Sequence, residues 1–373
     1  MSLFRNLTIG LFAILALSGC SESGGQTGAA DDGAAIVNVY NWSDYIASDV
    51  LTELEQEFGI RVNYDIYDSS ELVDSKLLAG ATGYDVILHD TQLIARLIPL
   101  GIFEPINRAQ LPNYDNLDRE LLDTMTFHDP GNTYSVPYMW GTVGFAYNVE
   151  MIEARMSDAP VDSAAFVFDP EIVSKFADCG VTFLDSPSDV IPMVLAYLGH
   201  DVNSMDDNHL AEAEAVLQSV RPYVKYFSSS RMIIDLPSEE VCIAMSWSGD
   251  YAQAWSRAKE ANIDIELAYN TPKEGFGLWV DGLVIPEDAS HKRNAHIFLN
   301  YLMRPDVIAR ISNYVYYANG NAASIPYLDP EVYSDPAIYP PPEVREVMFV
   351  KKVLPPKIER KRTRLWARLK TGI

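Results

Sequence analysis

The chain has 373 residues, enough for one large domain or two of ordinary size, and 48% of them are hydrophobic, so disorder is not expected. Its 28 basic and 52 acidic residues give a formal net charge of -24, which argues against phosphate-rich partners such as nucleic acid. The charge is compatible with a cationic ligand, although solubility alone would also account for it.

The N-terminus has the features of an export signal. Arg5 precedes an apolar run at 7–17 that is too short to span a bilayer, and small residues precede Cys20 in LSGC. We predict a lipoprotein signal peptide over 1–19, with Cys20 lipidated as the first mature residue. The alternative is an ordinary secretory signal with an incidental cysteine, and it also predicts export. Small polar residues at 20–35 predict a flexible tether.

Strands and helices alternate from residue 36 onward. The segments 36–41, 60–68 and 84–88 have the composition or the alternation of β-strands. Helical patterns lie between them, and the first is predicted to be capped by Ser48 and stopped by Gly59. This order predicts an α/β fold with a parallel sheet and right-handed crossovers.

Acidic and aromatic side chains follow these three strands. They are Trp42-Ser43-Asp44-Tyr45, Asp68-Ser69-Ser70 and His89-Asp90. Ligands of open parallel sheets bind beyond the carboxyl ends of the strands, so these loops are predicted to converge on one site. His89 with Asp90 could also form a catalytic dyad, but a hydrogen-bonded structural histidine is the favoured interpretation.

The rest of the chain continues the α/β pattern. Residues 134–148 look like a strand that crosses between two bodies, and a second α/β segment runs from about 160 to 255. A strand at 275–286 and a helix at 290–303 follow. From Lys351 onward the chain carries nine basic residues and one Glu. We interpret this segment as a solvated helix on an acidic body, in preference to a nucleic-acid or partner patch.

Tryptophans and acids recur as close pairs at predicted strand ends. The pairs are Trp42 with Asp44, Trp247 with Asp250, and Trp279 with Asp281. An indole face attracts an ammonium and covers methylenes, and carboxylates form charge-assisted hydrogen bonds with ammonium groups. Together the pairs favour a site for an alkyl cation. For any single pair, a half-buried Trp beside a surface Asp remains the alternative.

Motifs for catalysis or metal binding are missing. The sequence contains no GxSxG, HExxH, P-loop or complete GxGxxG motif. Cleft carboxylates with aromatic residues could serve a glycosidase, which is the best enzymatic alternative. Cys179 and Cys242 are suited to pair in an oxidising compartment, with two buried free thiols as the alternative. No CxxC spacing suggests a metal.

Several segments together resemble the polyamine-binding proteins of ABC-type importers, and the putrescine-binding branch is the most similar. These segments include VYNWSDYI, LLAGATGYDVI, VPYMWGTVGFAYN, CGVTFLD, WSGD, NYLMRPDVIA, YYANGNAAS and RTRLWARLK. The resemblance covers nearly all of the chain after Val37. It implies a two-lobed periplasmic-binding-protein fold, each lobe a mostly parallel sheet flanked by helices, joined by crossing strands and closing like a hinge. The implied division is 36–138 with 259–307 for lobe 1, and 139–258 with 308–373 for lobe 2.

The resemblance also implies a set of ligand contacts and a disulfide. The first lobe would contribute Trp42, Ser43, Asp44, Tyr45, Trp279 and Asp281, and the second would contribute Asp189, Trp247, Asp250 and Tyr317. Cys179 and Cys242 correspond to the disulfide of the family. The aromatic rings would sandwich the methylene stem of the ligand, and the carboxylates would hold its amines.

Some positions depart from the pattern of the putrescine-binding branch. Asp90 and Gln92 stand in a turn that is usually short and Ser-rich, and the added acid could favour a longer or more cationic ligand. Lys351 stands where an apolar residue is usual, and it could pair with Asp90 and cancel that charge. Trp279 stands where Phe is usual and Asp189 where Glu is usual, and Arg231 is a further base near the predicted rim.

The sequence therefore predicts a periplasmic, lipid-tethered, monomeric binding protein without cofactor or catalytic activity. It would capture putrescine or a related polyamine and deliver it to an inner-membrane ABC permease. A polyamine sensor that acts on a membrane signalling protein is the first alternative. A carbohydrate-active hydrolase is the second.

Overall fold

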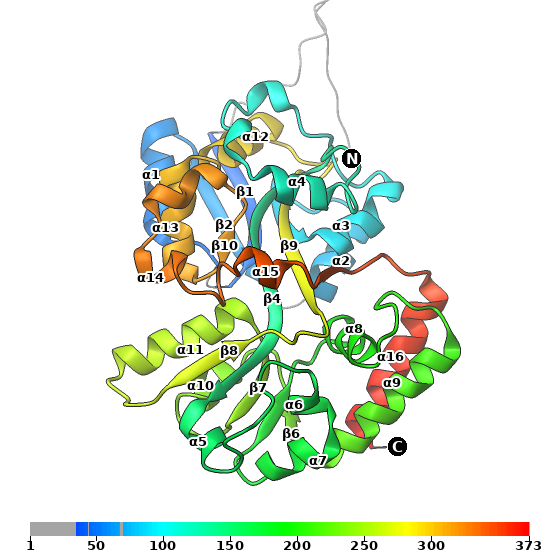
Figure 1. Ribbon diagram of the computed structural model, residues 1–373. Coiled ribbons are helices and arrows are strands. Elements are labelled where there is room, and N and C mark those ends of the chain that lie inside the picture. The colour runs from blue at the N-terminus through cyan, green and yellow to red at the C-terminus, as the bar shows by residue number, and fades with distance from the viewer. Residues whose placement is uncertain (1–34, 44, 68–69, 373) are drawn as a thin grey trace, which may run out of the picture.

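The structure is a computed structural model that describes residues 35–43, 45–67 and 70–372. The predicted signal peptide, Cys20 and most of the predicted tether lie outside the described residues, and so does Asp44. Figure 1 shows two α/β bodies, one above the other, which the long strand β4 (Ser135–Asn148) joins. The crossing strand predicted at 134–148 is confirmed.

The strands pair in one continuous order, β2-β1-β3-β9-β4-β7-β5-β6, with β8 and β10 on β4 and β11 on β9. The strands are β1 (Ile36–Trp42), β2 (Arg61–Tyr67), β3 (Val86–Asp90), β4, β5 (Val181–Phe183), β6 (Val224–Phe227), β7 (Ile243–Trp247), β8 (Leu267–Asn270), β9 (Phe276–Val284), β10 (Ala318–Asn319) and β11 (Met348–Val350). The outer strands are parallel, as predicted, whereas β4 and β9 run antiparallel to each other and to β7 and β3, respectively. The sheet therefore changes direction at the two long strands between the bodies.

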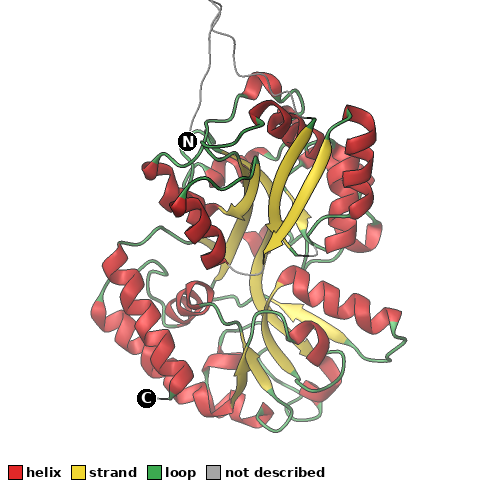
Figure 2. Cartoon of the chain, turned by 180° about the vertical axis from the view of Figure 1, so that it is seen from behind, coloured by secondary structure: helices red, strands yellow, loops and turns green. Residues whose placement is uncertain are grey.

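Helices flank the strands of both bodies, as Figure 2 shows from behind. They are α1 (Ser48–Phe58), α2 (Ser70–Ala79), α3 (Thr91–Leu97), α4 (Arg119–Met125), α5 (Val149–Glu153), α6 (Ala165–Phe168), α7 (Pro170–Val173), α8 (Pro187–Tyr197), α9 (Asp207–Val220), α10 (Met232–Asp235), α11 (Ser248–Glu260), α12 (Lys292–Leu302), α13 (Pro305–Val315), α14 (Pro330–Tyr333), α15 (Pro342–Arg345) and α16 (Pro356–Thr371). We call the body with β1–β3, α1–α4, α12 and α13 the first lobe. The body with β5–β8, α5–α11 and α16 is the second lobe.

The first lobe forms the elements that its hydrophobic pattern predicts. Helix α1 ends before Gly59, as expected, and buries Val50 and Leu54. The predicted cap at Ser48 is wrong, because Ala47 occupies the capping position and makes no side-chain hydrogen bond there. In α12, the apolar side chains that face the core include Phe298 and Leu299. Spacing along the chain identified the buried face of these helices more reliably than it identified the cap.

Two elements, β8 and α13, belong to a different lobe from the one that the predicted division gives them. Strand β8 was placed in lobe 1, but it pairs with β4 from Phe145 to Asn148, beside β7 of the second lobe. Helix α13 was placed largely in lobe 2, but Ile308 and Ile311 pack in the first-lobe core with Val39. The pairing of a strand and the apolar face of a helix decide which lobe each segment joins, and both depend on tertiary contacts.

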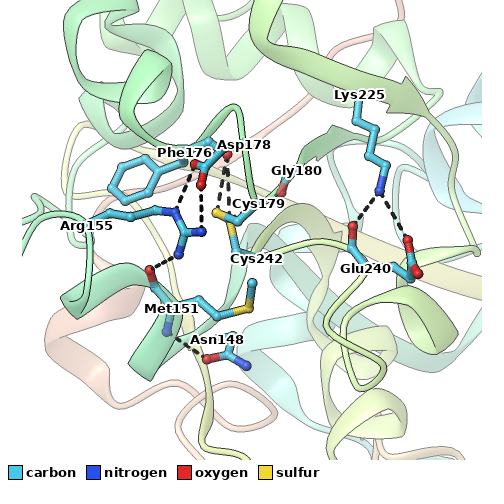
Figure 3. The surroundings of a disulfide bond; sticks show 10 residues. All are labelled: Asn148, Met151, Arg155, Phe176, Asp178, Cys179, Gly180, Lys225, Glu240 and Cys242. Atoms are coloured by element: carbon cyan, nitrogen blue, oxygen red, sulfur yellow. Dashed lines mark hydrogen bonds and ion pairs between the residues drawn. A yellow bond between two sulfur atoms is a disulfide. The ribbon is translucent and has the colours of Figure 1, made fainter.

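A disulfide joins Cys179 to Cys242 in the second lobe, with their Cα atoms 5.5 Å apart (Figure 3). It links the chain just before β5 to the residue before β7, two strands that are neighbours in the sheet. The predicted pairing is confirmed, and the alternative of two free thiols is excluded. A link across 63 residues contributes about 4 kcal/mol to stability in the chain-entropy description.

The basic C-terminal helix α16 lies on acidic elements of its own lobe. Its apolar side chains, Leu365 and Trp366 among them, pack in the second-lobe core. Its basic side chains pair with acids of that lobe, including Arg368 with Glu214 at 2.7 Å and Lys370 with Asp185 at 2.5 Å. These contacts agree with the predicted solvated helix on an acidic body.

Candidate functional site

Two strand ends, the interior of β9 and the start of α11 bring predicted side chains together where the two lobes meet. Asp90 ends β3, and Asp281 lies opposite it in the antiparallel pairing of β3 with β9. Trp279 lies two residues earlier on β9. From the second lobe, Trp247 ends β7 and Asp250 lies in the first turn of α11. Residues that are up to 191 positions apart in the chain (Asp90 and Asp281) thus share one region.

Two tyrosines connect the acids of this region. The Tyr45 hydroxyl donates to Asp281 Oδ2 at 3.0 Å, and the Tyr317 hydroxyl donates to Asp250 Oδ1 at 2.8 Å. The rings of Tyr45 and Tyr317 meet edge to face at 5.7 Å, and Trp279 meets Tyr317 in the same way at 5.1 Å. The aromatic side chains therefore form one contiguous group between the two carboxyl groups.

Two glycines make room for these rings. A Cβ on Gly249 would lie 2.2 Å from Tyr317 Cζ, and a Cβ on Gly141 would lie 2.4 Å from Trp279 Cζ2. Both separations are far below van der Waals contact, so any side chain at either position would displace a ring. The sequence analysis did not assign a role to these glycines, since a lone glycine in a strand or helix pattern gives no sign of what approaches it.

Asp250 and Asp281 are buried carboxyl groups that form no ion pair among the described residues, although the charge of Lys351 acts on Asp281 from a distance. Burial raises the pKa of Asp250 to about 7, and the hydrogen bond from Tyr317, which lowers this pKa, offsets only part of that rise. Burial, with the nearby charge of Asp90, raises the pKa of Asp281 to about 8. Ionised carboxylates at these two positions are costly until a positive charge comes close.

Asp189 has a different environment, because a lysine accompanies it. Lys351 Nζ lies 2.6 Å from Asp189 Oδ1, and both side chains are less than a tenth exposed. The Ser186 hydroxyl donates to the other carboxylate oxygen at 2.7 Å. The expected pairing of Lys351 with Asp90 is therefore wrong. Asp90 instead caps α3 and accepts a hydrogen bond from the backbone amide of Gln92 at 2.8 Å, because an acid at a helix N-terminus satisfies free amides.

The remaining predicted contacts lie around this centre. Trp42 is half-buried and packs its ring on Tyr67 at 4.4 Å. Trp247 is also half-buried and packs against the cores of both lobes. Ser43 is exposed, and its backbone amide donates to the Tyr67 carbonyl at 3.2 Å. Whether these side chains contact a ligand stays a prediction, as does the role of Asp44, which lies outside the described residues.

A cleft opens beside Trp279. Its lining includes Asp90, Thr91, Gln92, His128, Trp279 and Lys351. The Thr91 hydroxyl lies 2.9 Å from His128 Nδ1, and His128 Nε2 lies 2.7 Å from the Lys351 carbonyl oxygen. The sequence analysis missed His128, because it stands in a turn far from every strand end that the pattern singled out.

Two other noted residues take structural roles. His89 is fully buried and contacts Asp74 at 3.2 Å through Nε2, so it forms no dyad with Asp90. Arg231 forms an ion pair with Asp235 at 3.0 Å and is 61% exposed. The structural interpretation of His89 is confirmed, and Arg231 is occupied by an acid of its own helix region.

The described part of the chain contains no cluster of three or more metal-ligating side chains. Among residues 35–43, 45–67 and 70–372, no helix combines the length and the hydropathy needed to cross a bilayer. The chemistry that remains at the lobe junction is that of recognition, with carboxyl groups for cations and aromatic faces for apolar surface.

This combination of two α/β lobes, crossing strands and a polar site at their junction defines a two-lobed solute-binding protein. The chain belongs to the bacterial extracellular solute-binding protein family, whose sequence profile matches residues 49–340. The function of this family is to bind solutes for transport, in agreement with the prediction that the chain is not an enzyme.

Individual relatives are similar over almost the whole chain. The putrescine-binding periplasmic protein SpuD of Pseudomonas aeruginosa is 43% identical over 96% of this chain and 98% of its own length. The putrescine-binding periplasmic protein PotF of Escherichia coli is 45% identical over 90% of this chain and 91% of its own. Among solved structures, the spermidine/putrescine ABC transporter substrate-binding protein PotD of Streptococcus pneumoniae has a TM-score of 0.78 and 27% identity, covering 90% of this chain and 98% of that one.

Proposed function

We propose that the protein is an exported solute-binding protein that captures putrescine or a related polyamine between its lobes and delivers it to an ABC permease. The observation that carries the proposal is the pair of buried carboxyl groups, Asp250 and Asp281, which are joined by aromatic rings and form no ion pair among the described residues. Ammonium groups would satisfy both acids by charge-assisted hydrogen bonds.

The aromatic side chains account for the stem of such a ligand. An indole face attracts an ammonium by about 2 kcal/mol in a dry site, and each buried methylene adds about 0.8 kcal/mol. Trp279 and Tyr317, which are in contact, offer this surface between the two acids. An alkyl chain with a positive charge at each end matches this order of acid, ring and acid.

Closure of the lobes would complete the site. Asp281 stands on β9, which pairs with β3 of the first lobe, whereas Asp250 stands on α11 of the second. A ligand that holds both acids favours the closed arrangement over the open one, since it interacts with both only when they are near. Import is favoured over the sensor role by the relatives, which include a substrate-binding protein of an ABC transporter.

Calorimetric titration with putrescine, cadaverine and spermidine tests this function. We expect saturable binding of at least one of the three, and its loss in Asp250→Ala. Asp115→Ala is the matched control, because it removes the same charge from a side chain that is 89% exposed and lies away from the site. Absence of heat with all three amines in the wild-type protein would refute the proposal.

The proposal extends to the membrane tether. Export follows from the N-terminal segment, and Cys20 after small residues would receive the lipid that holds the monomeric protein at a membrane surface. Labelling with a fatty-acid analogue should mark the wild-type protein and fail to mark Cys20→Ser. Equal labelling of both proteins would show that Cys20 is not the lipidated residue.

Light scattering of the protein purified without its tether should give the mass of one chain.

A further inference from the structure

The cleft contains an ammonium group that belongs to the protein. Lys351 lines the cleft together with Trp279 and Asp90, and only 9% of its side chain is exposed. Its Nζ lies 2.6 Å from Asp189 Oδ1. Asp189, at 6% exposure, is one of the acids predicted to hold an amine of the ligand, but this acid already has a cation.

The backbone around Lys351 is held from both lobes. His128 Nε2 of the first lobe lies 2.7 Å from the Lys351 carbonyl oxygen, and Gln92 Nε2 donates to the Lys352 carbonyl at 2.8 Å. From the second lobe, Asn203 Oδ1 accepts from the Lys352 amide at 2.7 Å. The lysine is therefore a positioned part of the site, since a mobile surface chain would not have its backbone fixed on three sides.

Lys351 is positively charged at neutral pH. Burial by itself lowers the pKa of a lysine, but the carboxylates of Asp189, Asp90 and Asp281 more than offset burial here, and the pKa of Lys351 is raised. The charge of Lys351 acts to lower the pKa of Asp281, and the Tyr45 hydroxyl donates a hydrogen bond to Asp281 Oδ2. Lys351 thus pairs with Asp189 while it also lines the cleft beside Trp279 and Asp90, and we call this part of the lobe junction the Asp189 end.

We propose that Lys351 determines the length and charge of the ligand by occupying the Asp189 end of the site with its own ammonium. This inference rests on the proposed polyamine function. Asp250 and Asp281 remain to receive two ammonium groups, which suits a short diamine. A third ammonium that reached the Asp189 end would meet Lys351, and two like charges at close range in a poorly solvated cleft repel strongly.

A matched pair of variants tests this role. Wild-type protein, Lys351→Met and the control Lys357→Met are titrated with putrescine and with spermidine. Lys357 is exposed at the start of α16, so its loss changes the net charge equally without touching the cleft. We expect wild type to prefer putrescine, and Lys351→Met to shift the ratio of the two affinities toward spermidine by about tenfold or more. An unchanged ratio in a folded Lys351→Met would overturn the inference.

The double variant Lys351→Met/Asp189→Asn identifies the acid that Lys351 protects. It removes the pair together, so no buried carboxylate is left unpaired, and the gain in spermidine affinity should disappear. If the gain persists, Asp189 is not the group that Lys351 occupies. Folding of each variant is monitored by its melting temperature.

A comparison of ligands on the wild-type protein needs no variant. Acetylation of either terminal nitrogen of spermidine leaves the carbon–nitrogen backbone intact, adds one acetyl group and removes one charge. If Lys351 repels the third ammonium, the better of the two monoacetylated isomers binds more tightly than spermidine. If both bind more weakly than spermidine, removal of the third charge does not improve binding, and the inference fails. Absence of any binding by putrescine, spermidine or the acetylated forms would instead refute the polyamine function itself.

Discussion

Asp250 and Asp189 both lie buried near the lobe junction, but their surroundings are opposite. Asp189 has a protonated lysine at 2.6 Å, whereas the partner of the Asp250 carboxyl group among the described residues is the hydroxyl of Tyr317 at 2.8 Å. In a buried ion pair, each charge is compensated by its partner within the protein. A buried carboxyl group whose partner is a neutral donor avoids the cost of a buried charge only while it keeps its proton. The second arrangement leaves a place for a cation from outside, and the first does not.

The largest expected effect separates the two acids directly. Asp250→Asn retains a partner for Tyr317 and removes the charge, so the affinity for a diamine should fall by about a hundredfold. Asp189→Asn should lower the same affinity by less than about tenfold, but it should lower the melting temperature, because it leaves Lys351 buried without its acid. Calorimetry and thermal melting of the two variants provide the measurement. A greater loss of affinity in Asp189→Asn than in Asp250→Asn would reverse the comparison.

The pH dependence of binding tests whether Asp250 and Asp281 lack a cation. Their pKa values of about 7 and about 8 mean that both are partly protonated near neutral pH in the free protein. A bound ammonium favours the ionised form, so binding should release protons and affinity should rise from pH 6 to pH 8, by up to about tenfold per pH unit for each proton released. Titration in buffers of different ionisation enthalpy measures this release. Binding without proton release would show that these acids are already ionised.

The stability of the free protein should have the opposite dependence on pH. Because the folded-state pKa of each of these acids is raised, the folded chain binds more protons than the unfolded chain between about pH 4 and pH 8. Unfolding free energy should therefore decrease as pH rises through this window, and saturating diamine should cancel the decrease. Denaturant melts at several pH values check both statements. A rise in stability over the same window would contradict them.

A smaller effect is expected from the aromatic wall at the Asp250 end. In Gly249→Ala the new Cβ would collide with the Tyr317 ring and displace the hydroxyl from Asp250, so diamine affinity should fall by about tenfold. Gly277→Ala is a matched control on β9, because a Cβ there meets ordinary contacts no closer than 3.6 Å. Calorimetry should find the control close to wild type. Equal losses in both variants would indicate general damage to the sheet.

The smallest effect on binding is expected from the disulfide, which joins Cys179 to Cys242 within the second lobe. Replacing Cys179 and Cys242 together by Ala should lower the unfolding free energy by about 4 kcal/mol, the contribution of a loop of this length. Diamine affinity should change by less than about twofold, because the link joins neighbouring strands within the second lobe (Figure 3). A change in affinity as large as that of Gly249→Ala would connect the second-lobe core to the site.

Much of the site was predictable because strand ends of an α/β fold converge. Asp250, Trp279, Asp281 and Tyr317 were named from predicted strand ends or from the family resemblance, and the structure brings them together. The predicted strand-end position of Trp279 and Asp281 is wrong, because both lie within β9. The pairing of Lys351 was not predictable. Lys351 pairs with Asp189 and Asp90 caps α3, and which acid lies within ion-pair distance of a lysine 162 residues further along the chain depends on the tertiary structure.

The alternation of strands and helices, the long crossing strand and the acid–tryptophan pairs could be predicted from the amino-acid order, because periodicity and neighbouring residue types are local properties of a chain. The lobe that β8 and α13 join, the glycines that face the rings and the acid that pairs with a lysine became known from the folded chain. Each of these depends on the distance between groups that are far apart in the chain, and burial, which sets the charge of Asp250 and Asp281, exists only after the chain has folded.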